Sequence, residues 1–185
     1  MSNALSSLGF YKLGTMSDSW VRGLQEEVPT LVTNWSGRQG FYSTMNEDDS
    51  AFKQKVEARL SAMMEDWLAE HFPAHHLLLV SLVVKFPKGD QIVGLHRDWA
   101  YVDETKHNSL NFWIPLEDVD EQRGCLHVVG GSHHSASPFR GSPFVSMPKH
   151  LEETIMQGAE ALPMRKGEVL VYDSRLLHFS NPCSG

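Results

Sequence analysis

The sequence contains only two cysteines, Cys125 and Cys183, among 185 residues. Two cysteines cannot build the dense disulfide framework that stabilises small secreted domains, so the fold must depend on its own hydrophobic core. The sequence also shows no charged-then-apolar leader and no apolar run of about 20 residues, the patterns typical of secretion and of a membrane span. We therefore expect a reduced, cytoplasmic protein that has no membrane partner.

Positive charge is also scarce. The chain has 16 Lys and Arg against 23 Asp and Glu, a net charge of −7. Nucleic-acid binding needs clustered Lys and Arg, and no such cluster is visible, so we expect a small-molecule substrate and no nucleic-acid partner. The length suits a single domain over residues 1–185, and the composition leaves the oligomeric state open.

Residues 1–76 are predicted to be mainly helical and to support the rest of the fold. Ser17 and Ser50 are candidate N-caps for helices over residues 17–28 and 50–72. In the second helix apolar residues recur at helical spacing and form one stripe, which is typical of a face packed on a core. Gly and Ser interrupt residues 34–43, which we predict to be a loop.

From residue 77 onward the pattern changes to short apolar runs separated by Gly and Pro. The runs are LLLVSLVVKF, SLNFWIPL, CLHVVG and GEVLVYDSRLLHFS. No long helix separates them, although KHLEETIMQ at 149–157 is a candidate short one. This pattern predicts a mainly β domain with N-terminal helices, in which antiparallel strands form a sandwich or barrel.

The stretch VGLHRDWAYVDE, residues 93–104, places His96 and Asp98 directly after a strand-like segment. Such a pair alone is compatible with a hydrogen-bonded strand end or with a metal site. In an extended segment residues i and i+2 point to the same side, so both side chains can reach one ion, while Arg97 should point away, to solvent or to a carboxylate. His178, at the end of another strand-like run, completes the two-histidine, one-carboxylate set that is common in oxygen-activating Fe(II) sites.

Three ordered stretches carry a family resemblance: HRDWAY, NFWIPLEDVDEQRGCLHVVGGSH and KGEVLVYDSRLLHFSNPCSG. Together they resemble the phytanoyl-CoA dioxygenase (PhyH) family of Fe(II)/2-oxoglutarate-dependent oxygenases. The resemblance covers residues 77–185 and implies a double-stranded β-helix (jelly-roll, cupin-like) core there. It also implies Fe(II) bound by His96, Asp98 and His178, with 2-oxoglutarate and dioxygen as co-substrates. The implied reaction is hydroxylation of a small molecule with release of succinate and CO2.

The resemblance further suggests contacts with 2-oxoglutarate. Ser180, two residues after the distal histidine, matches a serine that contacts the far carboxylate of the co-substrate. Asn111 and Trp113 lie on a strand that lines the pocket in relatives, although Trp113 also suits a barrel core. Lys85 is polar within an apolar run and either enters the same cavity or is an edge lysine whose ammonium reaches solvent.

The sequence departs from the family pattern in two places. Gly130 stands where relatives have proline in the turn before a Ser-His pair. More seriously, relatives place an arginine beyond the distal histidine to bind the 2-oxoglutarate carboxylate, and the sequence ends at Gly185 without one. We expect the natural chain to continue past Gly185 with a further closing strand; otherwise Lys85 or Arg175 must supply the cation, or co-substrate binding is impaired.

Two other functions remain open from the sequence. One is a non-catalytic metal- or ligand-binding cupin-like module, which the missing arginine favours. The other is a zinc hydrolase with the same ligands, which is weaker because no general base stands beside them. The substrate is not specified: candidate lid segments over 34–46, 101–108 and 134–150 carry cations, but such loop cations are usually solvated. These cations are Arg38, Lys106, His107, Arg140 and Lys149.

Overall fold

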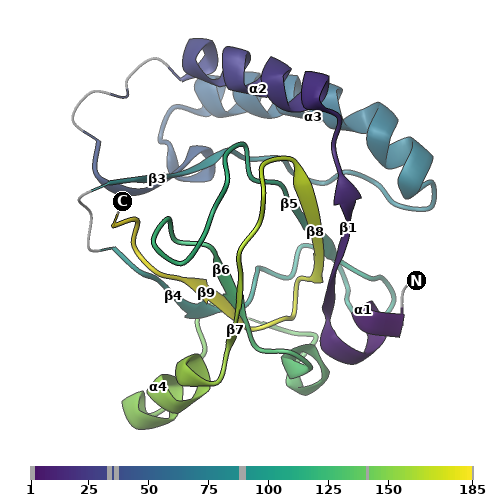
Figure 1. Cartoon of the computed structure of the whole chain (residues 1–185). Coiled ribbons are helices and arrows are strands. Elements are labelled where there is room, and N and C mark those ends of the chain that lie inside the picture. The colour runs from purple at the N-terminus through teal and green to yellow at the C-terminus, as the bar shows by residue number, and fades with distance from the viewer. Residues whose placement is uncertain (1–2, 33–34, 36–37, 88–90, 141, 185) are drawn as a thin grey trace.

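The computed structural model describes residues 3–32, 35, 38–87, 91–140 and 142–184 (Figure 1). Its helices and strands are α1 (Asn3–Leu8), β1 (Phe10–Thr15), α2 (Asp18–Leu31), β2 (Gly40–Ser43), α3 (Ser50–His71), β3 (Val83–Phe86), β4 (Val93–His96), β5 (Leu110–Trp113), β6 (Leu126–Val128), α4 (Lys149–Gln157), β7 (Glu160–Leu162), β8 (Glu168–Asp173) and β9 (His178–Ser180), with short 3₁₀ turns at Thr44–Asn46 and Ser132–Ser135.

Two antiparallel sheets form the centre of the molecule. Their strand orders are β1-β8-β5 and β4-β9-β6-β7, and β2 pairs separately with β3. Side chains alternate along β8: Leu170 and Tyr172 pack with Leu126 and Val128 of the second sheet in the inner core. Residues on the two inner faces of packed sheets interdigitate in this way. The arrangement confirms the mainly β, jelly-roll fold that the sequence predicts.

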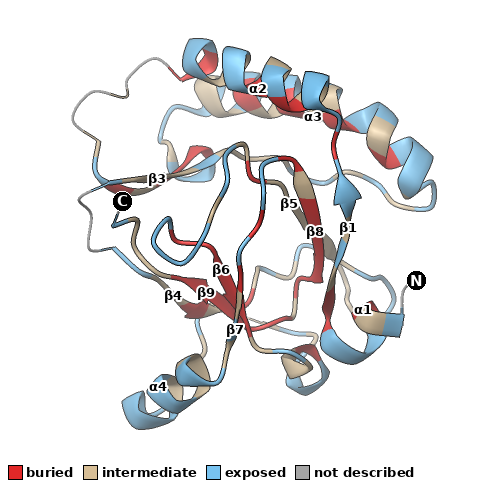
Figure 2. Cartoon of the chain, in the orientation of Figure 1, coloured by how far each residue is buried: buried red, intermediate tan, exposed pale blue. Residues whose placement is uncertain are grey.

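The other face of the β1-β8-β5 sheet is covered by helices. Val169 and Val171 of β8 pack in a cluster with Val21 of α2 and Trp67 of α3. Both helices are buried on the side toward the strands and exposed on the other (Figure 2). The Ser17 hydroxyl accepts from the Trp20 amide as the predicted cap of α2. No described helix is both long and apolar enough to cross a membrane.

Asp49 caps α3 in place of the predicted Ser50, because its carboxylate accepts from the amides of Ala51 and Phe52. The correction is one residue, and Ser50 is the first residue of the helix. The predicted stripe is confirmed: Val56, Leu60, Met64 and Leu68 are the buried residues of α3. Helix α4 occupies the residues predicted for it.

The N-terminal region holds more strand than the sequence predicts. β1 pairs with β8 from Phe10 opposite Tyr172 to Thr15 opposite Glu168, so it belongs to the core sheet. β2 falls within the predicted loop 34–43 and pairs with β3; residues 33–34 and 36–37 lie outside the described residues. Within 77–86 only Val83–Phe86 forms a strand. Short strands whose partners are distant in sequence leave little local signal.

The second sheet also has an inner and an outer face. Leu95, Leu177 and Phe179 form an outer cluster, against which Ile155 and Met156 of α4 pack. Because neighbouring residues of a strand face opposite sides, His178 and Ser180 of β9 are turned inward, and both are buried. The helix on the outer face therefore fixes which β9 side chains enter the space between the sheets.

Candidate metal centre

His96, Asp98 and His178 come together at one end of the second sheet. His96 ends β4 and lies opposite His178, the first residue of β9, with ring centroids 4.1 Å apart. Asp98 follows the strand, and its main-chain amide donates to the Ser174 carbonyl at 3.0 Å. One ligand atom from each side chain lies within 4.8 Å of the other two. The structure thus brings together the three predicted ligands.

Main-chain carbonyls orient both imidazoles. Nδ1 of His96 lies 2.8 Å from the Gly94 oxygen, and Nδ1 of His178 lies 3.0 Å from the Leu176 oxygen. A carbonyl oxygen can only accept, so each Nδ1 carries the hydrogen and each Nε2 keeps its lone pair, as in metal-bound histidines. Burial lowers the pKa of His178; Asp98 opposes this effect and His96 adds to it. Histidine binds metals as the neutral imidazole that results.

The Asp98 carboxylate has a neutral hydrogen-bond donor, the side-chain amide of Asn111. Asn111 Nδ2 donates to Oδ2 at 2.8 Å and to the Ser174 hydroxyl at 3.0 Å. Burial first, and the Asp98 carboxylate next, raise the pKa of Tyr172, so this buried hydroxyl lies in the field of the carboxylate. A neutral donor fixes the direction of a carboxylate without neutralising its charge. His96, Asp98 and His178 therefore form a ligand set that suits a divalent cation.

A family model described as phytanoyl-CoA dioxygenase (PhyH) matches residues 19–185. The chain belongs to the phytanoyl-CoA dioxygenase family. The match begins well before residue 77, where the sequence resemblance was first visible, and so includes the helices α2 and α3.

Individual relatives are distant. A phytanoyl-CoA dioxygenase domain-containing protein 1 homolog from Dictyostelium discoideum is 24% identical over 99 residues, 49% of this chain and 35% of the relative. The epimerase SnoN, in complex with Fe3+, alpha ketoglutarate and nogalamycin RO, gives a TM-score of 0.67 at 20% identity, over 98% of this chain and 76% of that one. HygX from Streptomyces hygroscopicus, with nickel and 2-oxoglutarate bound, gives 0.62 at 17% identity, over 98% and 79%. EvdMO1 gives 0.64 at 22% identity, but only 44% of that chain is covered. These structures share the fold, and the chain spans about a third of the curated relative.

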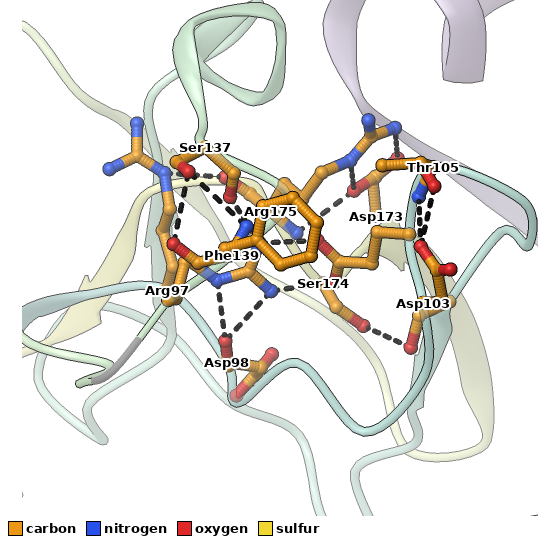
Figure 3. Close-up of polar contacts among 12 residues, drawn as sticks. Arg97, Asp98, Asp103, Thr105, Ser137, Phe139, Asp173, Ser174 and Arg175 are labelled. Carbon is orange, nitrogen blue, oxygen red and sulfur yellow. Dashed lines mark hydrogen bonds and ion pairs between the residues drawn. The ribbon is translucent and has the colours of Figure 1, made fainter.

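Arg97 lies between two of the triad residues of this PhyH-family chain. The sequence predicts that its side chain reaches solvent or a carboxylate, and this prediction is wrong. Arg97 is buried, and its guanidinium donates to the carbonyls of Arg175 at 2.8 Å and Ser132 at 3.2 Å and to the Ser135 hydroxyl at 3.3 Å. Burial, and then Arg140, lower its pKa. The side chain therefore joins the segment after β4 to the segments around residues 132 and 175. Figure 3 labels Arg97 and Arg175.

We expect Arg97→Gln to lower the free energy of unfolding by about 2–3 kcal/mol, because shortening the side chain leaves buried carbonyl oxygens without donors. Urea denaturation measures the change. Lys149→Gln is the control, because its ammonium is exposed on α4 and its loss should change stability by less than about 0.5 kcal/mol. Equal stability of the two variants would contradict the structural role assigned to Arg97.

A second buried arginine lies beside Asp98. Arg140 forms a bidentate ion pair with Glu104, with Nη2 2.6 Å from Oε1, and the two side chains are 7% and 2% exposed. The same guanidinium donates to the main-chain oxygen of Asp98 from Nη2 at 3.1 Å and Nε at 3.3 Å. Arg140 is thus not the solvated lid cation considered from the sequence. Nothing in the sequence indicates this pair, because its members lie 36 positions apart.

Of the cations considered for 2-oxoglutarate, Arg175 is already occupied: its Nε and Nη2 donate to the Asp173 carboxylate at 2.8 and 2.6 Å. Lys85 is different. Its ammonium is half-buried and donates to the main-chain oxygens of Gly124 and Asn181, the latter directly after Ser180. Burial lowers the pKa of Lys85 to about 8. Lys85 is therefore an interior cation beside Ser180, and not an edge lysine with its ammonium in solvent.

The two remaining predicted pocket residues face the interior together. The strand neighbours of Asn111 and Trp113, namely Leu110, Phe112 and Ile114, pack in the helix-covered outer cluster. Trp113 itself packs against the inner core cluster, and Asn111 bonds to Asp98. The predicted inward direction agrees with these contacts. Trp113 packs in the core, as one of its two predicted roles requires. Contact of Asn111 or Trp113 with 2-oxoglutarate stays a prediction.

Proposed function

We propose that this chain is a mononuclear non-haem Fe(II)/2-oxoglutarate-dependent dioxygenase that hydroxylates a small molecule and releases succinate and CO2. One observation carries the proposal: His96, Asp98 and His178 place their ligand atoms within 4.8 Å of one another, with both Nδ1 atoms engaged elsewhere. Two imidazoles and one carboxylate are the usual protein ligands of oxygen-activating Fe(II). Family membership and the metal and 2-oxoglutarate contents of SnoN and HygX support it.

The residues divide the work as follows. His96 and His178 would bind iron through Nε2, and Asp98 through its carboxylate, which Asn111 holds in direction. Bound iron supplies the redox chemistry and the coordination positions at which dioxygen and 2-oxoglutarate react. The apolar inner core keeps bulk water from the space between the sheets, and Trp113 is part of that wall.

We assign the far carboxylate of 2-oxoglutarate to Ser180 and Lys85. Ser180 is buried on the inner side of β9, and the Lys85 ammonium bonds to the next residue along the strand. An ammonium whose protein partners are neutral carbonyls keeps its charge available to a carboxylate. An arginine encoded beyond Gly185 would share or take over this role.

The pKa of Lys85 gives a pH-dependent prediction. Because burial lowers it to about 8, with the neighbouring Cys125 and Cys183 opposing the shift, the ammonium loses its proton as the pH rises through 8. We expect the affinity for 2-oxoglutarate to fall over that range. Lys85→Met should bind 2-oxoglutarate about tenfold to a hundredfold more weakly at pH 7 and should lose this dependence. Calorimetric titrations between pH 6.5 and 9 measure both effects; an unchanged pH profile in the variant would remove Lys85 from the site.

The activity itself is tested by anaerobic loading with Fe(II) and 2-oxoglutarate, followed by oxygen. We expect succinate, even without substrate, from protein that includes any residues encoded after Gly185. Hydroxylation further predicts a product heavier than its substrate by one oxygen atom. A product two hydrogens lighter, or an isomer, would assign a different oxidation to the same site, as in the carbocyclase SnoK and the epimerase SnoN.

One observation favours a binding module as the second candidate. Among the described residues, the guanidiniums of Arg97, Arg140 and Arg175 near the triad are all bonded within the protein. Protein that binds Fe(II) and 2-oxoglutarate but forms no succinate on exposure to oxygen would identify the module.

A further inference from the structure

Four aromatic side chains stand exposed near the triad on two separate segments, 99–104 and 138–140 with 142–145. Trp99, Tyr101, Phe139 and Phe144 are 48%, 51%, 76% and 66% exposed, and we call them the aromatic rim. Exposed rings are unfavourable in water, and grouped ones mark a binding surface more often than single ones do. Their position therefore bears on what reaches the metal centre.

Each residue of the aromatic rim lies next to a triad residue, in sequence or in space, or next to a residue that contacts one. Trp99 directly follows Asp98, and the carboxylate raises the pKa of Tyr101 in addition to burial, which places that hydroxyl in its field. Phe144 forms a β-bridge with His96, and their ring centroids lie 6.2 Å apart. Phe139 precedes Arg140, whose guanidinium bonds to the Asp98 oxygen, and is drawn with Asp98 in Figure 3.

A hollow of about 390 Å³ lies between the two segments. Its lining residues are Ala100, Val102, Asp103, Pro138, Phe139 and Arg140. The volume is within the range of small-molecule sites, and the lining combines four apolar residues with the polar Asp103 and Arg140. Phe139 belongs both to the rim and to the lining of the hollow, and Trp99, Tyr101 and Phe144 lie on the two segments that border it; we call the rim and the hollow together the entrance.

The charged side chains beside this entrance form two ion pairs, one buried and one exposed. Arg140 is neutralised by Glu104, and Lys106 pairs with Asp103 at 2.7 Å. Arg140 is the one arginine or lysine among the described residues of these two segments, and Glu104 occupies its guanidinium; Lys106 lies just outside them, in the exposed pair with Asp103. Asp98 adds negative charge beside them. An anionic group entering here would lose its hydration without gaining the guanidinium or ammonium partner that phosphates and carboxylates require.

We propose that the rim and the hollow bind an uncharged substrate with a flat apolar face, and that they do not accept acyl-CoA thioesters, whose phosphates have no partner here. The inference rests on the proposed function, because it takes the molecule bound at the rim to be the one oxidised at the triad. Ring faces on the two segments would stack on such a substrate and remove apolar surface from water.

The test titrates probes at pH 7 by calorimetry into the purified full chain. Two probes share one ring system and differ in charge, 2-naphthol and 2-naphthoate, and the third is the thioester palmitoyl-CoA. We expect 2-naphthol to bind at least tenfold more tightly than either anionic probe. Phe139→Ala and Phe144→Ala should each weaken it several-fold, and Phe139→Leu, which keeps an apolar but not a flat side chain, should fall between. Leu78→Ala is the control, because Leu78 is 56% exposed and lies outside both segments; its affinity should equal that of the wild type.

Equal or tighter binding of 2-naphthoate, or rim variants that bind 2-naphthol as well as Leu78→Ala does, would overturn the inference. The titration needs no turnover, so it is separate from the test of the enzyme. If the wild-type protein prefers 2-naphthol but forms no succinate, the result supports the proposed entrance and contradicts the proposed function. If the wild-type protein forms succinate but prefers 2-naphthoate or palmitoyl-CoA, the result supports the proposed function and contradicts the assigned substrate class.

Discussion

Asp98→Ala should bind Fe(II) more than about 100-fold more weakly than the wild-type protein, and should form no succinate. The substitution removes one of three ligand side chains and the negative charge that balances the metal. It also leaves the Asn111 amide, which donates to Asp98 at 2.8 Å, without that acceptor. Anaerobic Fe(II) titration measures the affinity, and equal affinity in the variant and the wild type would mean that the three residues are a structural cluster.

Asp98→Glu separates geometry from charge. It keeps the carboxylate but moves it outward by one C–C bond, whereas metal–ligand distances tolerate errors of only about 0.2 Å. We expect this variant to lose most of its activity as well. Asp66→Glu, at an exposed position of α3, is the matched control and should change stability by less than about 0.5 kcal/mol. Full activity in Asp98→Glu would exclude a direct bond to the metal.

The triad could be predicted because its signals are local or ordered along the chain. His96 and Asp98 lie two residues apart beside a strand, and His178 ends the GEVLVYD run within a family-like motif. The i, i+2 spacing along β5 likewise indicates that Asn111 and Trp113 share one side, whereas the family resemblance is what indicates Ser180. The structure agrees with each of these placements, since the outer neighbours on both strands pack under helices.

The residues that support the triad could not be predicted, because their partners lie on other segments. A solvated arginine and a buried one look the same in sequence, so the sequence predicts solvent or a carboxylate around Arg97 and a solvated position on a candidate lid for Arg140. The decisive contacts are with main-chain oxygens, such as those of Arg175 and Asp98, and every residue has such an oxygen. β1 was missed for a related reason: its six residues are stabilised by β8, more than 150 positions away.

The Arg140–Glu104 pair should be the most sensitive of these supports. Glu104→Gln leaves the Arg140 guanidinium charged and 7% exposed without its counter-ion, and breaking a buried pair from one side typically costs about 3–5 kcal/mol. We expect a loss of that size in the free energy of unfolding, measured by urea denaturation. Fe(II) affinity should fall by about tenfold, because the Asp98 main chain loses its fixed donor.

A double variant distinguishes two causes of the lost stability, namely the loss of the ion-pair attraction and the burial of an unpaired charge. Glu104→Gln combined with Arg140→Met removes both charges, so part of the lost stability should return, whereas Fe(II) affinity should stay low because no donor to the Asp98 oxygen is restored. Lys106→Gln, in the exposed pair with Asp103, is the control and should cost less than about 1 kcal/mol. If Glu104→Gln were as mild as Lys106→Gln, the buried pair would not hold Asp98 in place.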